Sequence, residues 1–115
     1  MGTINAGMLT TRENVEKHPD RVLELVRAHV KATLFLQKNP GAWLDKAVSF
    51  GTERAILDLA AENIELAWLI DENFVERAKA LGARMEALKV IDRQPDYDAL
   101  FDLSFVKKVK EELGL

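Results

Sequence analysis

The sequence predicts a mainly α-helical chain of about five to six helices with one short strand near the N-terminus. Three observations predict this class. Apolar residues recur at helical spacing along most of the 115 residues, capping residues or prolines precede the periodic runs, and glycine or an asparagine–proline pair follows them. We therefore expect a single segment, 1–115, with a strand end and cap at 6–11 and helices over 12–113.

The composition narrows the class of molecule before any motif is considered. Hydrophobic residues make up 48% and charged residues 30%, which is ordinary for a globular domain with a core. The net charge of −3 argues against a nucleic-acid partner, which usually requires a basic surface. The absence of cysteine excludes disulfides and cysteine-based zinc sites. No apolar run approaches the length of about 18 residues that suggests a membrane span, and no signal peptide is expected in this chain.

The stretch before the first helix is short and weakly apolar. Residues 6–11, AGMLTT, have the character of a strand end that leads into a helix cap, although so short a strand cannot build a sheet alone. Thr10 and Glu13 have the spacing of a capping box, so a first helical piece should begin directly after Thr10.

The second helix has the clearest boundaries. Pro19 suits a first helical position because its missing N–H would have no partner there, and Asp20 follows where the helix dipole favours an anion. The asparagine–proline pair at 39–40 ends the helix near Lys38. Its apolar arc is wider than that of a usual surface helix, so we expect burial on more than one side.

Shorter elements follow the second helix. Pro40 fits a first helical turn that leads into residues 42–48, and Gly51 should end this helix. Thr52 should cap a helix from Glu53 to about Ala61.

The run at 64–70, IELAWLI, is ambiguous by period, and we favour a helix. Asp71 then begins the most regular helix, in which apolar residues repeat at steps of four and three from Phe74 to Leu88. Residues 90–95 should form a loop.

Two short elements complete the chain. Asp96 should cap a turn over residues 97–101, and Ser104 should cap a last helix that runs to about Leu113. Gly114 lies just past its end, as expected for a C-terminal glycine.

The sequence offers few groups for catalysis, so we expect no enzyme, no metal site and no cofactor. His29 lies on the apolar face of its helix and could contact a ligand or act as a general base. The alternatives are a core histidine bonded to a backbone carbonyl, or one that faces a missing partner surface. Asp92, Asp96, Asp98 and Asp102 lack the spacing and the glycine of a calcium loop, so helix caps and solvated loop acids account for them better.

Thr10, Thr11 and Arg12 are the candidate ligand-binding residues. Free N–H groups, two hydroxyls and a guanidinium meet at this helix start, which could hold an anion; ordinary capping is the alternative. Trp43 and Trp68 could stack on a ligand, but tryptophans within apolar helical stretches are more often core anchors.

Two stretches resemble one protein family. Residues 10–45, TTRENVEKHPDRVLELVRAHVKATLFLQKNPGAWLD, resemble the C-terminal part of the ABC-transporter substrate-binding proteins that take nitrate, sulfonates, taurine and thiamine precursors. In that family a return strand leads into a helix with spaced apolar residues and alanines, and an asparagine–proline pair follows. The matching residues are Pro19, Val22, Leu25, Ala28, Lys31, Ala32, Asn39 and Pro40.

Residues 69–106 resemble the closing pattern of the same family. That pattern is a helix with spaced methionine, leucine and isoleucine, then a proline–aspartate loop, then D-x-S-F near the end. The matching residues are Met85, Leu88, Ile91, Pro95, Asp96, Asp102, Ser104 and Phe105. With the first stretch, the resemblance covers about residues 6–113.

The resemblance implies a C-terminal part of lobe 1 of a two-lobed α/β periplasmic binding protein. Residues 6–11 would then be the return strand, with its pairing strands outside this chain. The implied function is non-catalytic capture of a small anionic or heterocyclic solute in the periplasm, for delivery to an ABC permease. The cysteine-rich motif of the related thiamine-pyrimidine synthases is absent, which argues against an enzyme.

The alternative function is an independent helical protein-interaction module that self-associates through its apolar faces. The wide apolar arc of residues 22–36 is the feature that bears on it. In a fragment this arc would have packed on a sheet, and it would now be covered by a second copy or left as an exposed patch.

Overall fold

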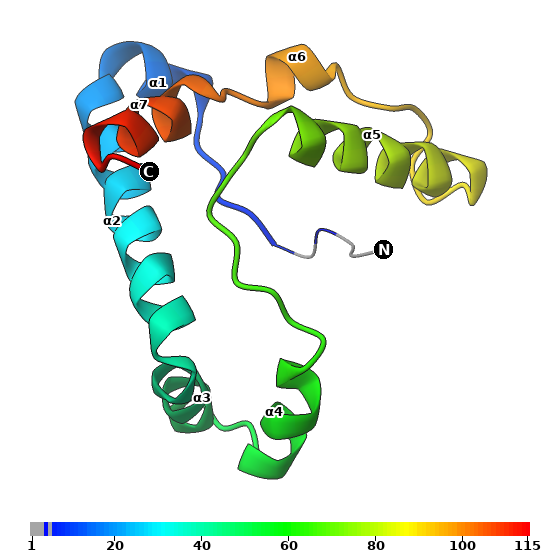
Figure 1. The fold of residues 1–115 in the computed structure, drawn as a ribbon. Helices are drawn as coiled ribbons and strands as arrows, with labels where there is room; N and C mark the ends of the chain where they lie inside the picture. Colours follow the sequence, from blue (N-terminus) through cyan, green and yellow to red (C-terminus); the bar gives the residue numbers. More distant parts are fainter. Residues whose placement is uncertain (1–3, 5) are drawn as a thin grey trace. The chain divides into compact units, whose positions relative to one another are not determined.

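The computed structural model describes Ile4 and residues 6–115 (Figure 1). Within them the chain forms seven helices and no strand, so the mainly α prediction is confirmed. The number exceeds the five to six expected, and the turn predicted at 97–101 is one source, since it forms the short helix α6. The elements are α1 (Arg12–Lys17), α2 (Pro19–Lys38), α3 (Pro40–Ser49), α4 (Arg54–Ala61), α5 (Glu72–Ala87), α6 (Tyr97–Leu100) and α7 (Ser104–Glu112).

The chain divides into two compact units. The terminal unit consists of the residues up to Val26 together with Leu69–Leu115, and the central unit is Arg27–Trp68. The first turns of α2 therefore belong to the terminal unit and the rest of the helix to the central unit.

The strand expected at residues 6–11 does not form within the described chain. This stretch has no regular structure, and its side chains are exposed, Leu9 by 90%. A strand persists when its N–H and C=O groups pair with a neighbouring strand, and the described part of the chain provides none. The stretch therefore stays irregular up to the cap of α1.

The cap of α1 lies one residue later than the expected capping box. Thr11 is the N-cap, and its Oγ1 accepts a hydrogen bond from the Asn14 N–H at 3.2 Å. Thr10 Oγ1 accepts from the Asn14 side-chain amide, also at 3.2 Å. A capping box needs Glu or Gln at this third helical position, so the reciprocal bond cannot form. Glu13 instead pairs with Lys17 at 2.8 Å.

The boundaries of α2 are those predicted. Pro19 is its first residue, and Asn39 separates its last residue, Lys38, from Pro40 at the start of α3. The Asn39 side-chain amide donates to the carbonyl of Phe35 at 2.8 Å. This bond satisfies one of the carbonyl groups that the end of a helix leaves without a partner.

One face of α2 is covered and the opposite face is not. Val30 and Thr33 are buried, whereas Leu25 and Phe35 are exposed by 55% and 57%. His29 is exposed as well, so it is not a core histidine. The expectation of burial on more than one side is wrong, because nothing in the described residues covers the second side.

α3 and α4 pack together within the central unit. Their buried apolar side chains are Leu44 and Leu57, each 9% exposed. Glu53, rather than the predicted Thr52, is the N-cap of α4. Gly51 ends the preceding helix with a φ of 103°, a left-handed conformation that favours glycine.

Arg54 links these two helices at their surface. Its Nε donates to Asp58 at 2.8 Å and its Nη1 to Asp45 at 2.7 Å. The hydrogen bond and charge of Asp58, and then the charge of Asp45, raise the pKa of Arg54 above its ordinary value. Exposed ion pairs contribute little stability. We therefore expect the burial of Leu44 and Leu57 to stabilise the packing of α3 on α4 more than the Arg54 ion pairs do.

The prediction of a helix at residues 64–70 is wrong. α4 ends at Ala61, and the chain then runs without regular structure as far as Asp71 (Figure 1). The physical reason lies in the composition of the run. Glu65 is its one charged residue, so no polar stripe opposes the apolar side chains as in a surface helix.

α5 begins as predicted. The carboxylate of Asp71 accepts a hydrogen bond from the Phe74 N–H at 2.9 Å. The helix ends in a Schellman motif, in which the Val90 N–H bonds the Met85 carbonyl at 2.8 Å. Lys89 takes the position usually held by glycine, with a φ of 56°.

α6 and α7 follow in the predicted order. Asp96 caps α6, as predicted, while Ser104 is the first residue of α7 rather than its N-cap. Asp102 accepts from the Ser104 N–H at 2.9 Å. Val106 and Val109 are the buried residues of α7 and form part of the core of the terminal unit.

Candidate functional site

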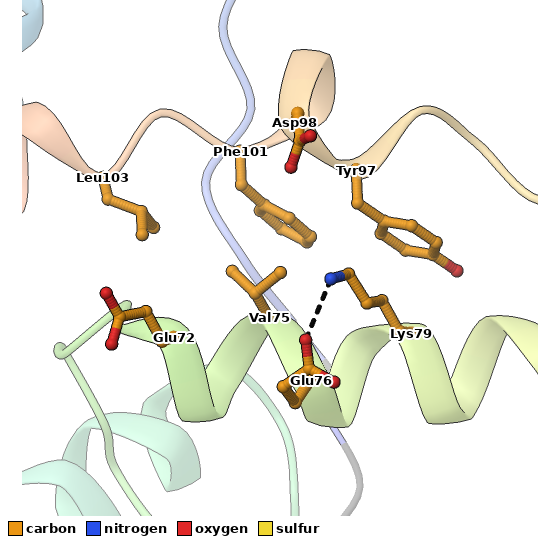
Figure 2. Close-up of a pocket in the computed structure, with 8 residues that line it drawn as sticks. All are labelled: Glu72, Val75, Glu76, Lys79, Tyr97, Asp98, Phe101 and Leu103. Atoms are coloured by element: carbon orange, nitrogen blue, oxygen red, sulfur yellow. Dashed lines mark hydrogen bonds and ion pairs between the residues drawn. The ribbon is translucent and has the colours of Figure 1, made fainter.

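A groove in the terminal unit is the first candidate site (Figure 2). It lies between α5 and the segment that runs from α6 to the start of α7, and its volume is about 270 Å³. Small-molecule pockets typically measure about 300–1,000 Å³, so this groove suits a side chain or a small group. The lining residues are Glu72, Val75, Glu76, Lys79, Tyr97, Asp98, Phe101 and Leu103.

Aromatic rings hold the two walls of the groove together. The Phe101 ring lies 5.6 Å from Phe74, edge to face at 87°, and 6.4 Å from Tyr97 at an interplanar angle of 15°. Figure 2 shows Tyr97 and Phe101 pointing toward α5, where Val75 lies opposite them. Ring pairs of this kind add about 0.5–1.5 kcal/mol beyond the area that they bury.

Gly82 allows Tyr97 to lie against α5. Gly82 is buried, and a Cβ atom there would overlap the Tyr97 hydroxyl and lie 3.2 Å from its Cζ. The hydroxyl donates to Gln94 Oε1 at 3.3 Å, and Gln94 Nε2 donates to Glu86 at 2.9 Å. Sequence reasoning missed this contact. The available signal was a glycine inside a regular helix, where it costs about 1 kcal/mol relative to alanine.

Charged groups rim the groove. Lys79 Nζ bonds Glu76 Oε1 at 2.9 Å (Figure 2). This hydrogen bond and the charge of Glu76, followed by the charge of Asp98, raise the pKa of Lys79 above its ordinary value. The carboxylate of Glu72 has no hydrogen-bond or ion-pair partner among the described residues. The rim is therefore acidic overall, and the lining contains no histidine, serine or threonine that could act as a nucleophile or base.

We expect Glu76→Gln to lower the pKa of Lys79 toward that of an ordinary lysine. The folded-state pKa is raised, so the stabilisation from the pair is present below the unfolded pKa. It is lost as pH rises through the folded pKa. An NMR titration of the Lys79 Cε signal measures the pKa of Lys79 in the wild-type chain and in Glu76→Gln. If the wild-type and Glu76→Gln curves coincide, the ion pair does not form in solution.

A second groove lies within the central unit and has a volume of about 330 Å³. Gln37 Nε2 donates to the Leu66 carbonyl at 2.6 Å, which fixes part of the 64–68 segment beside the end of α2. Trp43 lines this groove and, like Trp68, is half-buried, so a stacking role for either ring stays a prediction. The lining residues are Leu36, Gln37, Pro40, Trp43, Leu44, Ala61, Ile64, Glu65 and Leu66.

The predicted ligand residues stand at the start of α1. Thr10 and Thr11 both bond Asn14, so the capping alternative describes the role of Thr11 in the structure. Arg12 is exposed. None of the three lines either groove. Ligand binding by Thr10, Thr11 and Arg12 stays a prediction.

The remaining predicted chemistry concerns metals and membranes. The part of the chain that the structure describes holds no cluster of side chains suited to a metal ion. Asp96 is the N-cap of α6, which confirms that this acid acts as a cap. Asp102 accepts from the Ser104 N–H beside the start of α7, whose N-cap is Leu103. Of the described helices, none combines the length and apolar character that crossing a membrane requires.

Comparison with known proteins found no relative: no protein family, no curated protein and no solved structure matches the chain. The resemblance to solute-binding proteins therefore rests on the motifs of the sequence alone.

Proposed function

We propose that this chain is the C-terminal segment of a periplasmic solute-binding component of an ABC importer. The longer protein would capture a small anionic or heterocyclic solute between two lobes, without covalent chemistry, and deliver it to the permease. The resemblance of residues 6–113 to that family supports the proposal. One structural observation also supports it: many large apolar side chains of the chain are exposed.

Those side chains occur in both units. Among the described residues, more large apolar side chains are exposed than are buried. The exposed ones, 39–90% accessible, are Met8, Leu9, Leu25, Phe35, Val48, Phe50, Ile56, Leu59, Ile64, Leu88, Val90, Leu100 and Leu115. Single exposed apolar residues are normal, but a set of this size is expected where further protein covers the surface. A larger α/β body would provide that cover.

The proposal gives the irregular stretches a role. Residues 6–11 would pair as the return strand once the sheet of the first lobe is present. Thr10, Thr11 and Arg12 would then contribute to a ligand site that the rest of the protein completes. Arg12 is the natural contact for an anionic solute, because its guanidinium carries the one positive charge of the three residues. The threonine oxygens accept bonds from Asn14, so their O–H groups can still donate.

A self-associating helical module is the second candidate. Phe50, Ile56 and Leu59 of the central unit favour it, since they are exposed by 78%, 56% and 75%. If they form an interface between copies, the chain should dimerise without any other protein.

Titration calorimetry tests the proposal. The 115-residue chain should show no micromolar binding of nitrate, taurine or a thiamine pyrimidine precursor, because a site shared by two lobes loses most of its contacts when one is missing. A longer protein that contains this chain should bind one of them, and Arg12→Ala in that protein should weaken an anionic solute. Micromolar binding by the short chain would contradict the proposal.

A further inference from the structure

The segment 64–70, between α4 and α5, differs from an ordinary linker. Linkers are usually polar or rich in proline and glycine, whereas this run has one charge, no proline and no glycine. It shares its low charge and its lack of proline and glycine with short segments that pair as β-strands. In the structure the segment has no regular secondary structure (Figure 1).

From Ile64 to Trp68 the side chains alternate as in a strand. The even positions, Ile64, Leu66, Trp68 and Ile70, are all large and apolar, although Leu69 breaks the alternation. Within the central unit, Leu66 and Trp68 are half-buried, while Ile64, Glu65 and Ala67 are exposed. Successive strand residues point to opposite faces, so this pattern would place all four even residues on one apolar face.

An extended backbone over this segment would have one free edge. In an extended strand the N–H and C=O groups of alternate residues point to the same edge. On the even edge, the Leu66 carbonyl accepts from Gln37 and the Ile64 N–H donates to Ala61. On the odd edge, the backbone groups of Glu65, Ala67 and Leu69 have no hydrogen-bond partner among the residues that the structure describes.

We propose that residues 64–70 of two copies of this chain pair as antiparallel β-strands about a twofold axis at Ala67. Ala67 of each copy would exchange two N–H···O bonds with Ala67 of the other, and Glu65 would pair with Leu69 in the same way. The contact is self-complementary, as a twofold interface requires. This inference does not depend on the proposed transport function.

The side chains agree with this register. Leu66 would lie opposite Trp68 of the second copy and Ile64 opposite Ile70, so apolar residues face each other across the strands. The two Glu65 carboxylates would sit at opposite ends of the pair, which keeps like charges apart. Ala67, at the centre, is small and exposed and does not obstruct the approach of the second backbone. A pair of only two strands is marginal, so the association should be weak.

Sedimentation of the full chain from about 10 to about 500 µM tests the proposal in this weak-association range. Wild-type chain should dimerise as concentration rises, and exchange of the Glu65, Ala67 and Leu69 amides should slow in parallel. Ala67→Pro removes one N–H from each copy and so both central bonds, which should weaken dimerisation about tenfold or more. Ala67→Val keeps the N–H and favours extended backbone, so it should dimerise at least as well as wild type.

Two outcomes would overturn the proposal. One is a chain that stays monomeric at every concentration with fast exchange at these amides. The other is a dimer that Ala67→Pro leaves unchanged, which would assign association to the helical surfaces. Helical circular dichroism equal to wild type in both variants serves as the folding control.

Discussion

Leu57→Ala should lower the free energy of unfolding of the central unit by about 2–5 kcal/mol, the range for truncating a buried leucine. Leu57 is 9% exposed on α4 and packs where α4 meets α3, whose own buried leucine is Leu44. The unit has few other buried apolar side chains. A loss of this size should therefore unfold a large share of the central unit at room temperature.

Tryptophan fluorescence can follow that loss, because both tryptophans of the chain, Trp43 and Trp68, lie in the central unit. The matched control is Leu59→Ala, two residues away on the same helix but 75% exposed. It should change stability by less than about 0.5 kcal/mol. Equal effects at Leu57 and Leu59 would mean that α4 does not pack on α3 as the structure has it.

Gly82→Ala should destabilise the terminal unit although it improves the helix. Overpacking against the Tyr97 ring costs about 1–3 kcal/mol and alanine recovers about 1 kcal/mol, so the net loss should be up to about 2 kcal/mol. Tyr97 is the only tyrosine. Its ring NMR signals in a urea titration therefore report the contact, alongside helical circular dichroism.

Two comparisons isolate the cause. In a Tyr97→Ala background the ring that a Cβ at position 82 would overlap is absent. Gly82→Ala should then stabilise the terminal unit by about 1 kcal/mol. Gly41→Ala in α3 is the second control, since nothing lies within 4 Å of a Cβ there, and it should not destabilise. If Gly82→Ala stabilises the wild-type chain, Tyr97 does not rest on α5.

Helix boundaries were predictable where a local signal fixes them. Pro19 and the asparagine–proline pair at 39–40 set α2, and Asp71 sets the start of α5 by its own hydrogen bond. These signals act within one turn of backbone. The one-residue shifts at Thr11 and Glu53 arise where neighbouring residues compete for the same cap.

The errors fall where structure depends on distant groups. A strand at 6–11 needs partners that no local pattern can supply. At 64–70 an apolar run fits either period, and no partner decides between them in the described chain. The candidate groove depends on Gly82 and Tyr97, which lie fifteen positions apart in the sequence and meet through the packing of the segment 94–101 on α5.

The DNA upstream of codon 1 tests the central claim most directly. If the chain is the C-terminal segment of a solute-binding protein, the reading frame should continue upstream and encode a signal peptide and two α/β lobes. The sheet of the first lobe would then provide the strands that residues 6–11 lack. An in-frame stop codon immediately upstream, with no such lobes encoded, would contradict the account and leave the self-associating module as the function to pursue.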